Sequence, residues 1–174
     1  MLGMMRSAFK ARHYEEALEY ASDVKKDGRT TDDLKKEADY IRAKSYLATS
    51  RRAEAFAILD TLSSDPYCPE GAEASWLIIQ DCYDRGEFDE VESKVYSFSD
   101  AGTGQTYWLA KSFIVLGDAF AEKGDLEQAK ATFDSILEGY KPQQGGDDVT
   151  DNVRMRLSRL EEMMKNKADE YVQQ

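Results

Sequence analysis

Hydrophobic residues in the segment 108–142 recur at helical spacing in two runs, which a short Gly-Asp turn separates. Within each run the apolar positions lie three or four residues apart, so they fall on one face of an α-helix. The first run contains Leu109, Phe113, Leu116 and Phe120, and the second contains Leu126, Ala129, Phe133 and Ile136. Gly117 leaves room on the first face for close approach of a neighbouring helix. Gly124 can end the first helix in a left-handed conformation, and Asp125 can cap the second, so the segment predicts a helical hairpin.

The same hairpin pattern recurs upstream with a nearly constant period. Aligning the turns gives equivalent positions separated by 38, 36 and 38 residues, at Ala17, Ala55, Val91 and Ala129. A hairpin has two apolar sides and only one internal partner, so several hairpins bury their apolar surface by stacking. After residue 148 a further apolar stripe predicts a final capping helix, with Val153, Leu157, Leu160, Met164 and Ala168.

Composition narrows the fold class and the partners. The chain has 174 residues, 41% of them hydrophobic and only 3 of them proline, and it shows no alternating β-branched pattern, which favours one all-α domain. The net charge of -11 argues against nucleic acid as a partner. Arg154, Arg156 and Arg159 are interpreted as part of a mixed, solvated helix face because Glu161 and Glu162 follow them. The apolar runs are too short for membrane insertion.

The fourth hairpin resembles the tetratricopeptide repeat family. It carries the leucine-glycine pair Leu116 and Gly117, then Phe120 three residues after the glycine, Ala129 twelve residues after it, and a closing Pro142. The second unit keeps Ala43, Tyr46 and Ala55, whereas Ile79 and Cys82 make the third unit more divergent. The resemblance implies a right-handed α-solenoid of antiparallel hairpins in a single domain, 1–174. Its units lie at about 1–27, 31–64, 70–99 and 105–142, with the capping helix at about 148–172.

The resemblance also implies a function and a surface. Proteins of this family hold a peptide or protein segment on the concave face of the solenoid, so the chain is expected to be a non-catalytic interaction scaffold. Carrying the groove positions over gives Tyr40, Lys44, Glu73, Trp76, Gln80, Tyr83, Lys111, Ile114 and Asp118. Aromatic side chains often dominate binding energy, so Tyr40, Trp76 and Tyr83 are the leading candidates, although Trp76 and Tyr83 could instead pack between hairpins. The basic and asparagine pattern that clamps a terminal carboxylate in chaperone adaptors is not matched.

No catalytic, metal or cofactor site is predicted. His13 is the only histidine and has no neighbouring cysteine, so it indicates a surface residue rather than a ligand. Paired acids such as Glu15 and Glu16 point to different sides of a helix and are interpreted as solvated charges. The "AGTGQT" segment lacks a preceding strand and a Walker lysine, which indicates a loop rather than a phosphate cradle. An enzyme is disfavoured because no nucleophile, base and orienting group occur together.

The first unit looks truncated, since Met5 occupies the place of the repeat glycine. We expect Leu2, Met4 and Met5 to be exposed and to permit self-association, as in the C-terminal part of a longer bacterial repeat protein. The alternative function is therefore a structural spacer or self-association segment of a larger envelope-associated protein. The resemblance favours a periplasmic or outer-membrane-associated location, with the cytoplasm as the alternative, and Cys68 and Cys82 leave the redox compartment open.

Overall fold

The computed structural model describes residues 1–142 and 144–172, and the side chains of 1–142 and 144–168. Over these residues the chain forms nine α-helices and no strand, which confirms the prediction of an all-α protein. The helices belong to two compact units, Met1–Ile78 and Ile79–Gln174. Among the described residues, no helix combines the length and the apolar composition that crossing a membrane requires.

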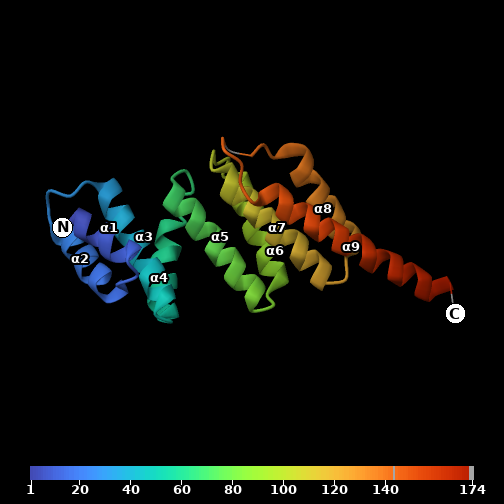
Figure 1. The fold of residues 1–174 in the computed structure, drawn as a ribbon, viewed down its shortest axis with the longest axis horizontal. Coiled ribbons are helices and arrows are strands. Elements are labelled where there is room, and N and C mark those ends of the chain that lie inside the picture. Colours follow the sequence, from blue (N-terminus) through green and yellow to red (C-terminus); the bar gives the residue numbers. More distant parts are fainter. Residues whose placement is uncertain (143, 173–174) are drawn as a thin grey trace. The chain divides into compact units, whose positions relative to one another are not determined.

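The first unit contains four complete helices and the beginning of a fifth (Figure 1). They are α1 (Leu2–Lys10), α2 (Tyr14–Lys26), α3 (Asp32–Ala48), α4 (Arg52–Leu62) and α5 (Pro69–Asp84), which continues into the second unit. Helices that follow one another from α1 to α4 pack together in pairs. Met5 is fully buried in a cluster with Ala17 and Ala21, and Leu2 packs against that cluster. The expectation that Met5 is exposed is therefore wrong, because α2 covers this face of α1; Met4 is 48% exposed.

The second unit contains the rest of α5 and the helices up to the C-terminus. These are α6 (Phe88–Asp100), α7 (Thr106–Glu122), α8 (Leu126–Gly139) and α9 (Val149–Val172). Helix α9 packs against both α7 and α8 through Val153, Leu157 and Leu160, which are buried. Ala168, which was expected on the same buried stripe, is exposed. The C-terminal part of α9 extends past α7 and α8 (Figure 1).

The turn between α7 and α8 has the predicted local chemistry. Gly124 adopts a positive φ of 80°, which a residue with a side chain rarely reaches without strain. The Asp125 carboxylate caps α8 by accepting a hydrogen bond of 3.1 Å from the Gln128 backbone N–H. Gly117 allows close helix approach as expected, because a Cβ atom at this position would lie 2.5 Å from the Phe133 ring.

Positions that the sequence pattern treats as equivalent hold buried side chains of different size. Four pairs occupy the place of Gly117 and the position sixteen residues later: Met5 and Ala21, Ala43 and Leu59, Ile79 and Val95, and Gly117 and Phe133. All eight residues are buried. Met5 packs in one cluster with the small residue Ala21, whereas Gly117 lies against the large ring of Phe133. In each of these two pairs, a large residue on one helix fills the space that a small residue leaves on the other. The arrangement of all hairpins in one solenoid stays a prediction.

Candidate functional site

Three predicted site residues of the first unit form one bonded group, Tyr40–Lys44–Glu73. The Tyr40 hydroxyl donates to Glu73 Oε2 at 2.7 Å, and Lys44 Nζ donates to Glu73 Oε1 at 2.6 Å. The Lys44 ammonium also lies 5.7 Å from the centroid of the Tyr40 ring. Burial and the adjacent Glu73 carboxylate raise the pKa of the Tyr40 hydroxyl, which keeps it a donor. Because Glu73 is only 9% exposed and both its oxygens accept bonds, this group ties α3 to α5.

Two further predicted residues, Trp76 and Ile114, differ in how much of their side chain is exposed. Trp76, one turn after Glu73 on α5, is half-buried, which is compatible with either a contact surface or a core position. Ile114 on α7 is 5% exposed because α6, α8 and α9 all pack against this helix. The Ile114 side chain therefore offers almost no surface to a partner.

Lys111 fastens the start of α9 to α7. Its Nζ donates to Asp148 Oδ2 at 2.9 Å, and the Tyr107 hydroxyl donates to Asp148 Oδ1 at 2.9 Å. The Lys111 ammonium, followed by the Tyr107 hydroxyl, holds the pKa of the Asp148 carboxyl below its usual range against the opposing effect of burial. Lys111 thus has a structural partner within the chain.

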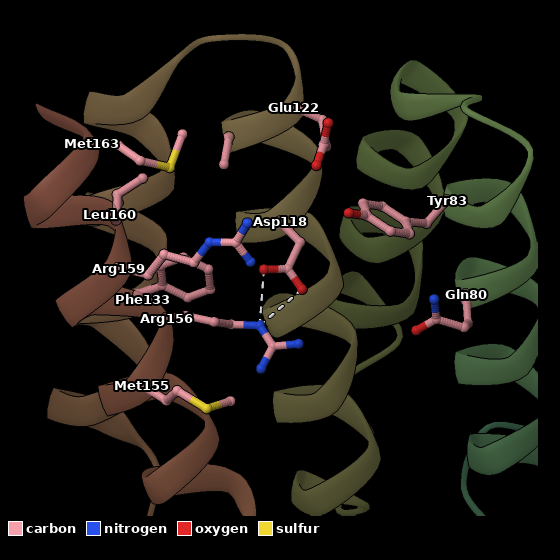
Figure 2. Close-up of a pocket in the computed structure, with 11 residues that line it drawn as sticks. Gln80, Tyr83, Asp118, Glu122, Phe133, Met155, Arg156, Arg159, Leu160 and Met163 are labelled. Atoms are coloured by element: carbon pink, nitrogen blue, oxygen red, sulfur yellow. Dashed lines mark hydrogen bonds and ion pairs between the residues drawn. The ribbon is translucent and has the colours of Figure 1, made fainter. Parts of the chain in front are cut away.

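The remaining predicted residues, Gln80, Tyr83 and Asp118, line one pocket in the second unit, with a volume of about 480 Å³ (Figure 2). We call it the α9 pocket. Helix α5 supplies Gln80 and Tyr83, α7 supplies Asp118 and Glu122, and α8 supplies Phe133. Helix α9 supplies the opposite wall, with Met155, Arg156, Arg159, Leu160 and Met163. The pocket brings together three predicted residues with Arg156 and Arg159, which had been interpreted as part of a solvated helix face, and with Leu160 of the predicted apolar stripe.

An ion pair crosses the α9 pocket from α9 to α7 (Figure 2). Arg156 Nε donates to both carboxylate oxygens of Asp118 at 2.8 Å, and Arg156 Nη1 donates to the Asn152 carbonyl at 3.4 Å. Burial raises the pKa of the Asp118 carboxyl, and the Arg156 guanidinium opposes that rise. The charge of Asp118 is therefore balanced within the chain, and the pair helps to hold α9 in place.

Arg159 lies in the same wall one turn beyond Arg156. Among the side chains that the structure describes, it makes no hydrogen bond and no ion pair. Met155 and Met163 flank it four residues before and after, and they are 64% and 42% exposed. Because residues four apart share one face of a helix, the three side chains form an exposed stripe, Met155–Arg159–Met163.

Sequence reasoning missed this stripe, although two signals could have indicated it. Met155, Arg159 and Met163 recur at a spacing of four, and Arg156 lies 38 residues after Asp118, which equals the repeat period. The stripe was missed because Glu161 and Glu162, which follow Arg159, led to the interpretation of a mixed, solvated helix face. Neither glutamate forms an ion pair with Arg159 among the described side chains.

The chemistry of the α9 pocket suits non-covalent binding. It holds two cations, two carboxylates, a phenol, two thioethers and an apolar floor of Phe133 and Leu160.

His13 lies in the first unit, where its side chain is 62% exposed and its Nδ1 is 3.7 Å from Glu16 Oε2. Within the described residues, no group of three or more histidines, cysteines and acids could hold a metal ion.

No protein-family model matches the chain, and searches of curated proteins and of solved structures gave no match. The resemblance to the tetratricopeptide repeat family therefore stays a prediction from the sequence pattern.

Proposed function

We propose that this chain is a non-catalytic protein-interaction scaffold that binds a segment of a partner protein in the α9 pocket. The observation that carries the proposal is the exposed stripe of Met155, Arg159 and Met163 beside a pocket of about 480 Å³. This volume lies within the range of about 300–1,000 Å³ that is usual for ligand sites. It would hold one or two partner side chains.

The side chains of the stripe are suited to contact with a protein. Methionine is flexible and polarisable, so an exposed pair of thioethers adapts to different apolar side chains. Buried Phe133 and Leu160 form a fixed floor beneath them, and half-buried Tyr83 contributes an aromatic edge on the opposite wall. Buried, rigid apolar residues beside flexible, exposed methionines favour binding of a short peptide segment over chemistry on a small substrate.

The bonded groups elsewhere explain why the proposal concentrates on the α9 pocket. Tyr40, Lys44 and Glu73 bond to one another, Lys111 bonds to Asp148, and Ile114 is buried. Binding through these residues would first require breaking contacts within the chain, which costs free energy. Gln80 and Tyr83 remain candidates because they line the pocket, whereas Asp118 is engaged by Arg156.

The test is a selection from a random dodecapeptide library displayed on phage, followed by NMR of the ¹⁵N-labelled chain with a selected peptide. We expect amide shifts to concentrate at 80–83, 118–122 and 155–163. The double variant Met155→Ser and Met163→Ser should weaken binding about tenfold or more, since each change removes exposed thioether contact area. Both side chains are largely exposed, so the variant should stay folded.

A control variant carries Met1→Ser and Met4→Ser, which changes two exposed methionines of the first unit. It should bind selected peptides as the unchanged chain does. Failure of the folded chain to select any peptide would contradict the proposed function, and so would shifts confined to the first unit.

A further inference from the structure

We propose that the α9 pocket recognises a partner segment in which one acidic side chain lies between two apolar side chains. The carboxylate would pair with the Arg159 guanidinium, and the apolar side chains would lie on Met155 and Met163. This inference rests on the proposed function and adds the chemical identity of the bound segment.

The charges of the pocket direct the acidic group to Arg159. Asp118 accepts two bonds of 2.8 Å from Arg156, so these two residues already balance each other. Arg159 has no such partner among the described side chains, although it lines the same pocket. A guanidinium with five donors forms strong, charge-assisted bonds to a carboxylate. The Asp118 charge acts on Arg159 from a longer distance, but no described carboxylate bonds to Arg159, so a partner carboxylate would add direct bonds that the described side chains do not supply.

Besides Asp118, whose charge acts on Arg159, two further acids near Arg159 have to be considered. Glu122 ends α7 and lines the pocket on the same side as Tyr83 (Figure 2). Glu162 follows Arg159 by three residues on α9. Neither forms an ion pair with Arg159. Both glutamates are exposed, so each is hydrated without it. Arg159 thus remains available on the side that the two methionines flank.

The spacing of the stripe matches an extended peptide. Side chains four residues apart on α9 are separated by about 6 Å along the helix axis. Alternate side chains of an extended segment are about 6.6–6.8 Å apart on one face. The expected motif is therefore apolar-x-acidic-x-apolar, with the acidic residue opposite Arg159 and the two apolar residues opposite Met155 and Met163.

The experiment compares peptides that differ only in charge. A dodecapeptide selected on the full chain is synthesised in three forms, which carry Glu, Gln or Lys at the selected acidic position, and its affinity is measured by fluorescence anisotropy. We expect the Glu form to bind at least about tenfold more tightly than the Gln form, because a hydrogen bond to a charged group contributes more than a neutral one. The Lys form should bind more weakly still.

Variants of Arg159 link this preference to one side chain. Arg159→Gln should remove the difference between the Glu and Gln forms, and Arg159→Glu should reverse the preference in favour of the Lys form. Arg154→Gln is the matched control, since Arg154 lies on the same helix with a side chain that is 69% exposed and does not line the pocket. It should leave all three affinities unchanged.

The outcomes separate this inference from the proposed function. Peptides that bind the pocket without an acidic preference, or with one that Arg159→Gln does not change, would overturn the inference and leave the scaffold function in place. A folded chain that selects no peptide at all would overturn both. An acidic preference that Arg154→Gln abolishes equally would show general electrostatics and would also overturn the assignment to Arg159.

Discussion

At the residue scale, the size of one side chain is matched to the space that the opposite helix leaves. Gly117 meets the Phe133 ring so closely that a methyl group would lie 2.5 Å from it, whereas Met5 fills the equivalent place against Ala21. Well-packed interiors tolerate extra volume poorly, because neighbouring side chains must leave their preferred rotamers. Hydrophobic periodicity predicted these positions as core, but the periodicity does not say which residue of each pair supplies the bulk.

Gly117→Ala should lower the free energy of unfolding by about 1–3 kcal/mol, because the new methyl group overlaps the Phe133 ring. Urea unfolding followed by circular dichroism measures the change. The control is Gly139→Ala in α8, where no atom lies within 4 Å of the added Cβ. There the better helix propensity of alanine should leave stability unchanged or raise it by up to about 1 kcal/mol. Equal changes in both variants would contradict the steric explanation.

At the element scale, α9 is positioned by apolar packing and by two polar anchors. Val153, Leu157 and Leu160 pack inward, the Asp118–Arg156 pair joins the middle of α9 to α7, and Asp148 joins its start. The apolar stripe allowed the sequence to predict a capping helix near residue 148. The anchors could not be predicted in the same way, since they link residues 37 and 38 positions apart. Which charges meet across two helices depends on their rotation and their offset after packing.

Asp148→Asn should loosen the beginning of α9, because it removes the ion pair with Lys111 and weakens acceptance from Tyr107. Hydrogen exchange at 150–156 should become faster, with a loss of less than about 1 kcal/mol because the Asp148 side chain is partly solvated. The pKa of Asp148 is lowered in the folded chain, so its contribution is complete above the usual value of 3.8 and is lost as the pH falls below that value.

The matched control for this anchor is Asp151→Asn. Asp151 lies in the first turn of α9, just after Asp148, but its side chain is 89% exposed and its Oδ1 is 3.8 Å from Arg154 Nη1. Exchange should stay as in the unchanged chain. If both variants loosen α9 equally, the effect comes from the helix dipole rather than from the bonds of Asp148.

At the scale of the whole molecule, the chain folds into two compact units. Its sequence carries a net charge of -11. Some exposed apolar side chains are normal for a protein surface, so their grouping is more informative than their presence. Met1, which precedes α1, and Met4 on α1 are exposed at one end of the chain, and Met155 and Met163 are exposed on α9. The predicted self-association surface is smaller than expected, because Met5 is buried and Leu2 packs on the core beneath it.

Self-association through α1 stays a prediction at this scale. The weight-average mass from light scattering should rise above 19.7 kDa with increasing concentration, and Met4→Ser should reduce the rise. Met155→Ser is the control, since it removes a methionine from α9 that is more exposed, at 64%, than Met4 at 48%. A mass that stays at the monomer value at all concentrations would exclude the α1 surface as a self-association site.

The amino-acid sequence by itself determined what depends on neighbours along the chain. Helical periodicity, the Gly124 turn and the Asp125 cap act over a few residues, so composition and spacing were sufficient for the helices and for the hairpin turn. Gln80, Tyr83 and Asp118 were also named in advance as candidates, through their places in the repeat pattern.

Only the tertiary structure decided which candidate side chains have free surface. It buried Ile114 and joined Tyr40 and Lys44 to Glu73. It also paired Asp118 with Arg156, while Arg159 forms no hydrogen bond or ion pair with any described side chain. Arg156 and Arg159 have the same chemistry and lie three residues apart, so the sequence does not distinguish their roles. The difference arises because α9 packs at one rotation against α7, and that rotation brings only Arg156 within bonding distance of Asp118.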